Sequence, residues 1–441
     1  MEKFDVIVVG AGPAGNGAAY TLAKAGLSVL QLERGESPGT KNVQGAILYA
    51  DALEKIIPDF RETCPLERHI IEQRMWLMDE DQTCTGMSYR DARFSQEPYN
   101  RYTIIRARFD RWFSAQVKKA GALVVCETTV TELLRNGSGK VIGVRTEREK
   151  GDIYADCVIL ADGANALVGS RAGLRPEITA DDMALAVKEV LFLPKETVDA
   201  RFNISGTQGV VIEIAGNVTH GMLGTGFLYT NKDSLAIGIG CMLSDMKKQS
   251  LTPYQLLEGL KRHPTIKPLI EGAEMKEYSA HLIPEGGYKA LPQLYGDGWM
   301  IVGDAAGFVN AVHREGSNLA MTSGRMAAET LIALKAAGKP YSAANLAAYK
   351  RTLDDSFVMA DLKKYQDVPT LLTEQPHMLG MYPRFLGDAA RELLTVDGVS
   401  KRAKQQKIMA DLKGKRVGVL VSGGNVDLAH FCSLLQAGDP H

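Results

Sequence analysis

The chain has 441 residues, of which 45% are hydrophobic and 23% are charged, and its formal net charge is -1. This composition is typical of a soluble globular protein, and it provides no strong positive field for binding nucleic acid. The six cysteines include no C-x-x-C pair, so local spacing predicts neither a zinc site nor an iron–sulfur cluster.

Two features bear on targeting and membranes. The sequence opens as MEKFDVIVVG, which lacks the apolar core and cleavage site of a signal peptide, so we expect no targeting segment there. No run approaches the roughly 18–20 apolar residues that a membrane-spanning helix needs. We therefore expect a cytoplasmic protein, for which contact with a membrane surface stays possible.

The first predicted elements form a β–α–β unit. Residues 4–9, FDVIVV, have the continuous apolar character of a buried parallel strand. GAGPAG follows, and residues 16–25 then predict a helix that ends at Gly26. Residues 28–32, SVLQL, predict a second strand that ends at Glu33.

Three glycines lie between the first strand and the helix in the order G-x-G-x-x-G. Gly10 allows a tight turn, Gly12 lets a diphosphate approach the backbone, and Gly15 lets helix and strand pack closely. The helix N-terminus offers free N–H groups and a positive dipole end to phosphates. Glu33 is placed to accept hydrogen bonds from an adenosine ribose. The motif predicts a dinucleotide site but does not distinguish FAD from NAD.

The next part of the chain predicts a helix at residues 51–60 and a strand that continues as a helix over 102–121. Three short strands follow, and NGSG between the first two predicts a hairpin. Arg106 lies at the strand–helix junction, where it would either contact phosphate or flavin or form an ordinary salt bridge. ILADGAN, residues 159–165, predicts the return of these strands to the sheet near the cofactor, and we interpret Asp162 as structural.

The later part predicts an antiparallel sheet within residues 183–275, a buried strand in WMIVGDAAG at 299–307, and a long helix at 317–336. Asp304 ends the strand, where a carboxylate can hydrogen-bond to a polyol. The helix begins after Gly316, and its N-terminus would stabilise the negative charge that a reduced flavin carries at its pyrimidine end. We therefore interpret this stretch as the flavin end of one long cofactor rather than as a second nucleotide site.

GAGPAG with Glu33, RARFD, ILADGAN and VGDAAG together resemble the glutathione-reductase-like FAD fold, in its aromatic-hydroxylase and geranylgeranyl-reductase branch. Three longer segments, at 41–60, 278–294 and 303–329, are similar to the electron-transfer-flavoprotein:quinone oxidoreductase family. Within that family the resemblance is best to the branch of the bacterial Fix electron-transfer complex. It covers about residues 1–400.

The resemblance implies an α/β fold: a Rossmann-like FAD-binding domain of the glutathione-reductase type, an inserted antiparallel-sheet substrate domain and a helical C-terminal region. We expect the FAD-binding domain to be discontinuous, at 1–75, 101–175 and 276–336. The inserted quinone or substrate domain is expected at 76–100 and 176–275, and the mainly helical region at 337–441.

The family further implies one bound FAD, a quinone as electron acceptor, and an electron-transfer-flavoprotein pair, FixA and FixB, as donor. This chain lacks the C-terminal cysteine set with which single-chain members hold a four-iron cluster. A small ferredoxin-like partner, FixX, would supply that cluster, unless the electron route is absent. In nitrogen-fixing bacteria such a complex would supply reductant for nitrogen fixation.

The resemblance also assigns site residues. Those expected to hold the adenosine, diphosphate and ribityl parts of FAD are Gly10, Ala11, Gly12, Pro13, Ala14, Gly15, Glu33, Arg34, Arg106, Val130, Gly303 and Asp304. Those expected beside the isoalloxazine are Lys41, Gly45, Gly316, Ser317 and Asn318. His313, Arg314 and Glu315 are expected near the ring or the quinone, to tune the potential or handle protons, with a salt bridge inside the loop as the alternative. No metal is expected.

Three functions stay open at this point. The first is FAD-dependent electron transfer to a membrane quinone, the second is an NAD(P)H-dependent reductase or hydroxylase, and the third is a flavin-bearing scaffold without turnover. Residues 370–394 mix large apolar side chains with two prolines, and would form either an apolar plateau on the inner face of the cell membrane or helices that face the core or a partner. Residues 415–428, KRVGVLVSGGNVDL, differ from the family's C-terminal segment and receive no role.

Overall fold

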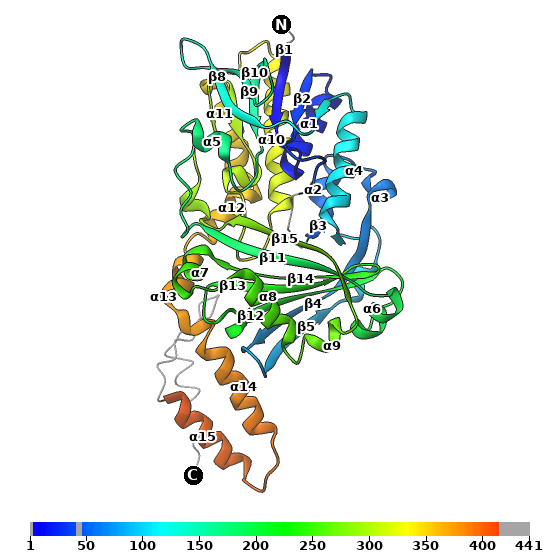
Figure 1. Cartoon of the computed structure of the whole chain (residues 1–441), viewed down its shortest axis with the longest axis vertical. Coiled ribbons are helices and arrows are strands. Elements are labelled where there is room, and N and C mark those ends of the chain that lie inside the picture. The colour runs from blue at the N-terminus through cyan, green and yellow to red at the C-terminus, as the bar shows by residue number, and fades with distance from the viewer. Residues whose placement is uncertain (1–2, 41–45, 414–441) are drawn as a thin grey trace. The chain divides into compact units, whose positions relative to one another are not determined.

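The computed structural model describes residues 3–40 and 46–413 (Figure 1). The predictions for Lys41, Gly45 and residues 415–428 therefore fall outside the described residues. The chain divides into two compact units, Met1–Arg384 and Phe385–His441. The larger unit contains both sheets and the cleft described below.

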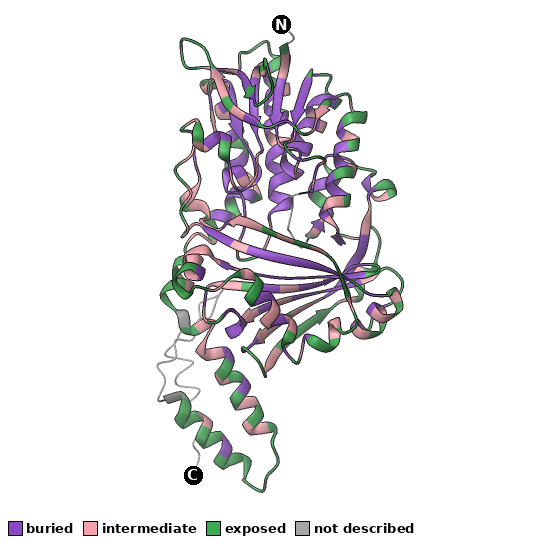
Figure 2. Ribbon diagram, viewed as in Figure 1, coloured by how far each residue is buried: buried purple, intermediate pink, exposed green. Residues whose placement is uncertain are grey.

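The first sheet has the strand order β16-β17-β10-β1-β2-β7, in which β17, β10, β1, β2 and β7 are parallel and β16 is antiparallel to β17. The antiparallel hairpin β8–β9 joins it through β9, which pairs antiparallel with β10. Its strands are β1 (Lys3–Val9), β2 (Val29–Leu32), β7 (Leu123–Val125), β8 (Val130–Arg135), β9 (Val141–Thr146), β10 (Asp152–Leu160), β16 (Tyr295–Gly296) and β17 (Trp299–Ile301). The strands predicted at 4–9 and 28–32 and the NGSG hairpin are confirmed. Their apolar runs lie in the interior, as the purple ribbons of Figure 2 show.

Two helices pack beside each other at this sheet, α1 (Pro13–Lys24) and α10 (Ser317–Ala336) (Figure 1). A Cβ atom on Gly324 of α10 would lie 2.1 Å from the carbonyl oxygen of Ala14 in α1. The two backbones are therefore in direct contact, which only glycine allows. The predicted helix at 317–336 is confirmed at both ends.

The second sheet has nine strands, in the order β15-β11-β14-β13-β12-β4-β6-β3 with β5 paired to β4. They are β3 (Ala46–Tyr49), β4 (Leu66–Met78), β5 (Cys84–Arg90), β6 (Arg101–Ile104), β11 (Met183–Phe192), β12 (Gln208–Gly216), β13 (Gly224–Thr230), β14 (Ser234–Met242) and β15 (Glu274–Pro284). All pairs are antiparallel except β4 with β12. The antiparallel sheet predicted within residues 183–275 is thus confirmed for the pairs that β11, β12, β13 and β14 form with one another. β12 also pairs in parallel with β4, which lies outside that range.

Helices complete both layers. One face of the second sheet packs against apolar side chains of α6 (Lys195–Phe202), α7 (Leu243–Gln249) and α8 (Pro253–Arg262). The remaining helices of the larger unit are α2 (Ala50–Glu54), α3 (Phe60–Thr63), α4 (Arg106–Lys119), α5 (Leu167–Arg171), α9 (Lys267–Ile270), α11 (Ala343–Asp354), α12 (Phe357–Lys364) and α13 (Val368–Glu374). α14 (Met381–Leu394) and α15 (Lys401–Lys413) follow. Within residues 3–40 and 46–413, no helix is both long and apolar enough to cross a membrane.

Two details differ from the sequence-based predictions. The single helix predicted at 51–60 is wrong: α2 ends at Glu54, because Pro58 has no N–H to continue it, and a separate α3 begins at Phe60. The second sheet also recruits β3, β4, β6 and β15, which the predicted segments placed wholly or partly in the FAD-binding domain. The segment limits stay a prediction.

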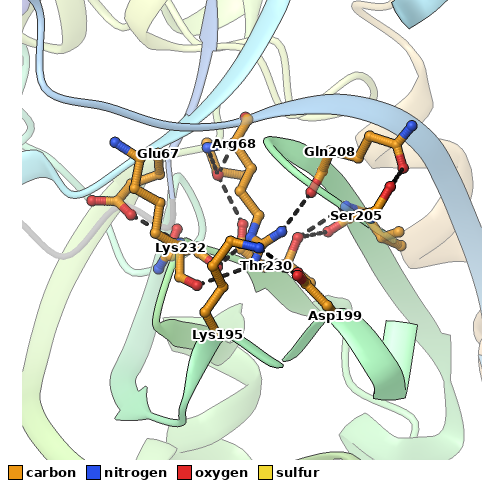
Figure 3. A network of polar contacts seen from close by, with 11 residues as sticks. Glu67, Arg68, Lys195, Asp199, Ser205, Gln208, Thr230 and Lys232 are labelled. Atoms are coloured by element: carbon orange, nitrogen blue, oxygen red, sulfur yellow. Dashed lines mark hydrogen bonds and ion pairs between the residues drawn. The ribbon is translucent and has the colours of Figure 1, made fainter. Parts of the chain in front are cut away.

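A buried ionic network holds the second sheet together at the Arg68 side chain, which is fully buried (Figure 3). Its guanidinium donates to the carbonyl oxygens of Asn231, Gln208 and Lys232 at 2.5, 2.8 and 3.0 Å. It also forms an ion pair with Asp199 at 2.8 Å. One side chain of β4 therefore satisfies backbone groups from two segments that lie more than a hundred residues away in sequence.

Candidate functional site

A cleft lies at the carboxyl ends of the parallel strands, where β1, β2, β10 and β17 end at or next to Val9, Leu32, Ala161 and Val302. This edge is where open α/β sheets bind ligands. The predicted residues that line the cleft are Gly10, Ala11, Gly12, Pro13, Ala14, Glu33, Arg34, Arg106, Val130, Asp304 and Ser317. The structure thus brings together residues from opposite ends of the chain.

The glycine turn has the geometry of a diphosphate cradle. Gly10 has φ +103°, and its N–H donates to the Leu32 carbonyl at 2.7 Å. A Cβ on Gly15 would lie 2.0 Å from the Gly10 carbonyl oxygen, so Gly15 serves the packing of α1 on β1 and does not line the cleft. A Cβ on Gly12 would meet no atom within 4 Å. The space in front of Gly12 is therefore open for a phosphate group.

Two buried side-chain amides hold the carbonyl groups of this turn in place by hydrogen bonds. The sequence-based prediction missed both. The Asn16 side chain donates to the Ala11 carbonyl at 2.9 Å, and Gln31 donates to the Gly10 carbonyl at 3.1 Å. Gln31 also donates to Asn16 Oδ1 at 3.1 Å, and both residues have 0% exposure. For Gln31 the available signal was a polar residue inside an otherwise apolar strand, because a buried polar side chain must find hydrogen-bond partners.

Glu33 is fixed by the backbone. Its Oε2 accepts the Ala11 N–H at 2.9 Å and its Oε1 accepts the Gly35 N–H at 2.7 Å. Each carboxylate oxygen retains a second lone pair, so the group is still able to accept hydrogen bonds from ribose hydroxyls. Thr128, Thr129 and Val130 line the cleft with it.

Arg106 is both a salt-bridge residue and a lining residue. Its guanidinium makes a two-point contact with Asp110, with Nε to Oδ1 at 3.0 Å and Nη2 to Oδ2 at 2.9 Å. The side chains are 3% and 0% exposed, so the partner is buried and not a surface carboxylate. This pairing fixes a positive charge at the wall of the cleft.

Two carboxyl groups in the cleft have raised pKa values, Asp162 and Asp304, and burial is the first cause in both cases. Asp162 Oδ2 accepts the Val168 N–H at 3.0 Å, which agrees with a structural role. Its Oδ1 is buried and has no hydrogen-bond partner within the described residues. An orphaned acceptor in the cleft wall fits a ligand that carries hydroxyl groups.

Gly303, Gly316, Asn318 and the predicted His-Arg-Glu triplet do not line this cleft. A Cβ on Gly303 would lie 2.7 Å from the Cβ of Ala14, so Gly303 serves helix packing. The Asn318 amide donates to Glu315 Oε2 at 3.0 Å.

The members of the triplet contact different partners. His313 Nε2 lies 2.8 Å from the Tyr365 hydroxyl, and Arg314 donates to the Gly226 carbonyl at 3.1 Å. Glu315 pairs through its backbone with Asn310. Their predicted place near the ring or quinone stays a prediction.

His281 is a lining residue that the sequence reasoning did not assign, although it stands in the segment 278–294. Burial lowers its pKa, and the positive charges of Arg106 and Arg34 lower it further. A neutral imidazole at this wall can donate or accept one hydrogen bond without adding charge. Residues 3–40 and 46–413 contain no group of three or more His, Cys, Asp or Glu arranged to hold a metal ion.

Glu285, just beyond β15, gives a prediction for the pH dependence of stability. Burial raises its pKa from 4.5 to about 7, Arg314 opposes this shift, and Asp304 adds to it. Between these two values the folded protein holds a proton that the unfolded chain releases, so the free energy of unfolding falls as pH rises. We expect Glu285→Gln to be more stable than the wild type by about 3 kcal/mol at pH 8 and equally stable below pH 4.5. Urea unfolding at several pH values measures this. Equal pH dependence in the two proteins would contradict it.

Comparisons with known proteins place the chain among flavoproteins. A family model described as "FAD binding domain" matches residues 3–225, which is about half of the chain. A second model, described as "ETF-QO/FixC family C-terminal domain", matches residues 368–420. The two matches cover the glycine turn and the C-terminal helices, respectively.

Curated relatives match over nearly the whole chain. Protein FixC of Bradyrhizobium diazoefficiens is 59% identical, over 92% of this chain and 93% of its own length. Protein FixC of Azotobacter vinelandii is 59% identical over 94% of this chain and 96% of its own length. The probable electron transfer flavoprotein-quinone oxidoreductase YdiS of Escherichia coli is 41% identical, over 95% of this chain and 96% of its own.

A solved structure supports the fold. A geranylgeranyl bacteriochlorophyll reductase-like protein from Thermoplasma acidophilum superposes with a TM-score of 0.71 at 20% identity, covering 94% of this chain and 99% of the other. The cleft geometry fits FAD, and the residues that would hold it are those of the glycine turn, Glu33 and the Asp162 and Asp304 walls. The chain belongs to the ETF-QO/FixC family and is an FAD-dependent oxidoreductase.

Proposed function

We propose that this protein accepts electrons from an electron-transfer flavoprotein of the FixA/FixB type and passes them to a membrane quinone. A ferredoxin-like protein of the FixX type would be the further partner, in a complex that supplies reductant for nitrogen fixation. The observation that carries the proposal is the identity of 59% with two proteins named FixC over at least 92% of this chain. The name of the Escherichia coli relative, an electron transfer flavoprotein-quinone oxidoreductase, supports the donor and acceptor classes of this proposal.

The chain's own residues would perform binding and orientation. FAD supplies the reversible two-electron chemistry when it is bound. The N-terminus of α1, with Gly12 at its start, would bind the diphosphate, and Glu33 would orient the ribose. Asp304 would hold the ribityl part beside the N-terminus of α10, which favours negative charge. Lys41 and Gly45 remain proposed contacts on the basis of the resemblance alone.

Contact with the cytoplasmic face of the membrane is part of the proposal, because quinones dissolve in the lipid phase. Exposed apolar side chains of α14 support it: Leu386 and Leu394 are 44% and 80% exposed. A helix with exposed leucines would also suit a protein partner. We propose that this helix contacts the membrane rather than a protein partner, because the proposed acceptor dissolves in lipid.

The Asp304→Ala variant tests the proposal. We expect it to lose bound FAD, seen as loss of the flavin absorption spectrum, and quinone reduction together. The purified wild type should be reduced by a reduced electron-transfer flavoprotein and reoxidised by ubiquinone-1. Rapid reduction by NADPH alone, without the flavoprotein donor, would favour a reductase or hydroxylase instead. A wild type that binds FAD and its partners without any turnover would be a scaffold.

A further inference from the structure

Arg175 lies behind the wall of the FAD cleft. It belongs to the segment that runs from α5 to β11, and it does not itself line the cleft. Its Nη1 donates to the carbonyl oxygen of Ala305 at 2.7 Å and lies 3.4 Å from the carbonyl oxygen of Asp304. Both carbonyls belong to the short 3-10 helix Gly303–Ala306, the turn that brings the Asp304 side chain to the cleft. Arg175 therefore ties this turn to a segment that lies 130 residues before Ala305 in the sequence.

The positive charge of Arg175 has no close partner. In the described part of the chain no carboxylate lies at ion-pair distance from its guanidinium, although the side chain is partly buried. The carboxyl groups that act on it electrostatically are those of Asp162, Asp182 and Asp304. Asp182 has a separate partner, because its Oδ2 accepts the Thr179 hydroxyl at 2.6 Å. A partly buried charge without a close partner is costly, so a role in holding the turn does not by itself account for an arginine here.

Asp162 has one carboxylate oxygen that the protein does not use. Its Oδ2 accepts the Val168 N–H at 3.0 Å, while its Oδ1 is buried and has no partner in the described part of the chain. Burial raises the pKa of this carboxyl group, and the Val168 N–H and the charges of Arg175 and Arg34 oppose that shift. Arg175 thus favours the ionised form of Asp162 without occupying Oδ1.

The same relation holds for Asp304. The groups of the protein that donate to this residue, among those described, do so at its backbone carbonyl and leave its carboxylate free. Burial raises the pKa of the carboxyl group, and Arg106 and Arg175 oppose the shift. Glu285 faces the same carboxyl group, and the two acids disfavour each other's ionisation. Arg106 is paired with Asp110, whereas no carboxylate offsets the charge of Arg175 at close range.

We propose that Arg175 is a positioning residue of the FAD site. It holds the turn that carries Asp304, and its charge keeps the carboxylates of Asp162 and Asp304 ionised without using their free lone pairs. A direct ion pair would occupy those lone pairs. A positive charge at a greater distance leaves them for the hydroxyl groups of the ligand. The inference concerns the cofactor site alone, so it goes beyond the proposed function and does not depend on the electron acceptor.

The test measures the Kd for FAD of the full-length protein after its flavin has been removed, by the quenching of FAD fluorescence at pH 6 and pH 8. The wild type should differ by less than about twofold between the two pH values. Arg175→Gln retains an N–H donor but has no charge. We expect its Kd to be about tenfold higher at pH 6 than at pH 8, because a carboxyl group that takes up a proton loses acceptor capacity. Arg175→Lys restores the charge and should restore the flat profile.

Arg171→Gln is the matched control. Arg171 is exposed in α5 of the same segment, so its substitution should leave the Kd within about twofold of the wild type at both pH values. Glu285 and His281 are present in every protein compared, so their own titration cancels in the comparison.

The pH profile separates an electrostatic role from a structural one. If Arg175→Gln weakens FAD binding by the same factor at pH 6 and pH 8, Arg175 acts only by holding the turn, and the proposal is overturned. If Arg175→Gln does not fold, as judged by circular dichroism, Arg175→Lys decides the question. A wild-type Kd at both pH values would support the role of the charge, and loss of FAD binding at both would overturn it. These measurements use no electron donor and no quinone, so their result is independent of the proposed electron transfer.

Discussion

Substitution of Gly12 by valine should abolish FAD binding while the protein stays folded. The Gly12 backbone is extended, with φ -79° and ψ -176°, so a side chain introduces no strain there. A Cβ at this position meets no protein atom within 4 Å, but the added methyl groups would fill the space in front of the α1 N-terminus. We expect the affinity for FAD to fall at least about a hundredfold, because the diphosphate can no longer reach the helix N–H groups. Flavin absorbance after desalting measures the loss.

Two glycine substitutions provide the comparison. Gly137→Val lies in the β8–β9 hairpin, where a Cβ also meets nothing within 4 Å, and it should retain full FAD content. Gly15→Ala should instead destabilise the fold, because its Cβ would lie 2.0 Å from the Gly10 carbonyl oxygen. Stoichiometric FAD in Gly12→Val would disprove the assignment of the diphosphate to this turn.

Replacement of Arg68 by methionine should lower the free energy of unfolding by about 3 kcal/mol or more. The methionine side chain has a similar length, but it leaves three buried carbonyl groups and Asp199 without their shared donor. Asp199 retains a contact with Lys195, so the carboxylate accounts for the smaller part of the loss. Urea unfolding at pH 7 is the measurement.

Arg93→Met is the matched control for this network. Arg93 pairs with Asp91, but its side chain is 78% exposed, so its removal should cost less than about 1 kcal/mol. A similar loss in both variants would mean that the Arg68 network contributes no more than a surface ion pair does.

The sequence predicted the cofactor-binding half of the fold well, because local patterns define it. The apolar run before GAGPAG, the glycines themselves and the long helix after Gly316 each carry their signal within a short window. The bounds of α10 agree with the prediction at both ends. Glu33 could be placed because its position at a strand end follows from the same β–α–β unit.

The second sheet could not be predicted in the same way. Alternation identifies a strand but not its partner, and the parallel pairing of β4 with β12 joins residues about 140 positions apart. Asn16 was missed because the sequence does not show whether an amide side chain on a helix is buried or exposed. The contact of His313 with Tyr365 depends on how α12 packs, 52 residues further along the chain.

The backbone contact between Gly324 and Ala14 sets the distance between α10 and α1. The N-terminal residues of α1 and α10, among them Pro13 and Ser317, line the same cleft, and the direct backbone contact fixes how the two helices lie against each other. A larger residue at position 324 would push the two helices apart and so change the separation of the two helix N-termini at the cleft.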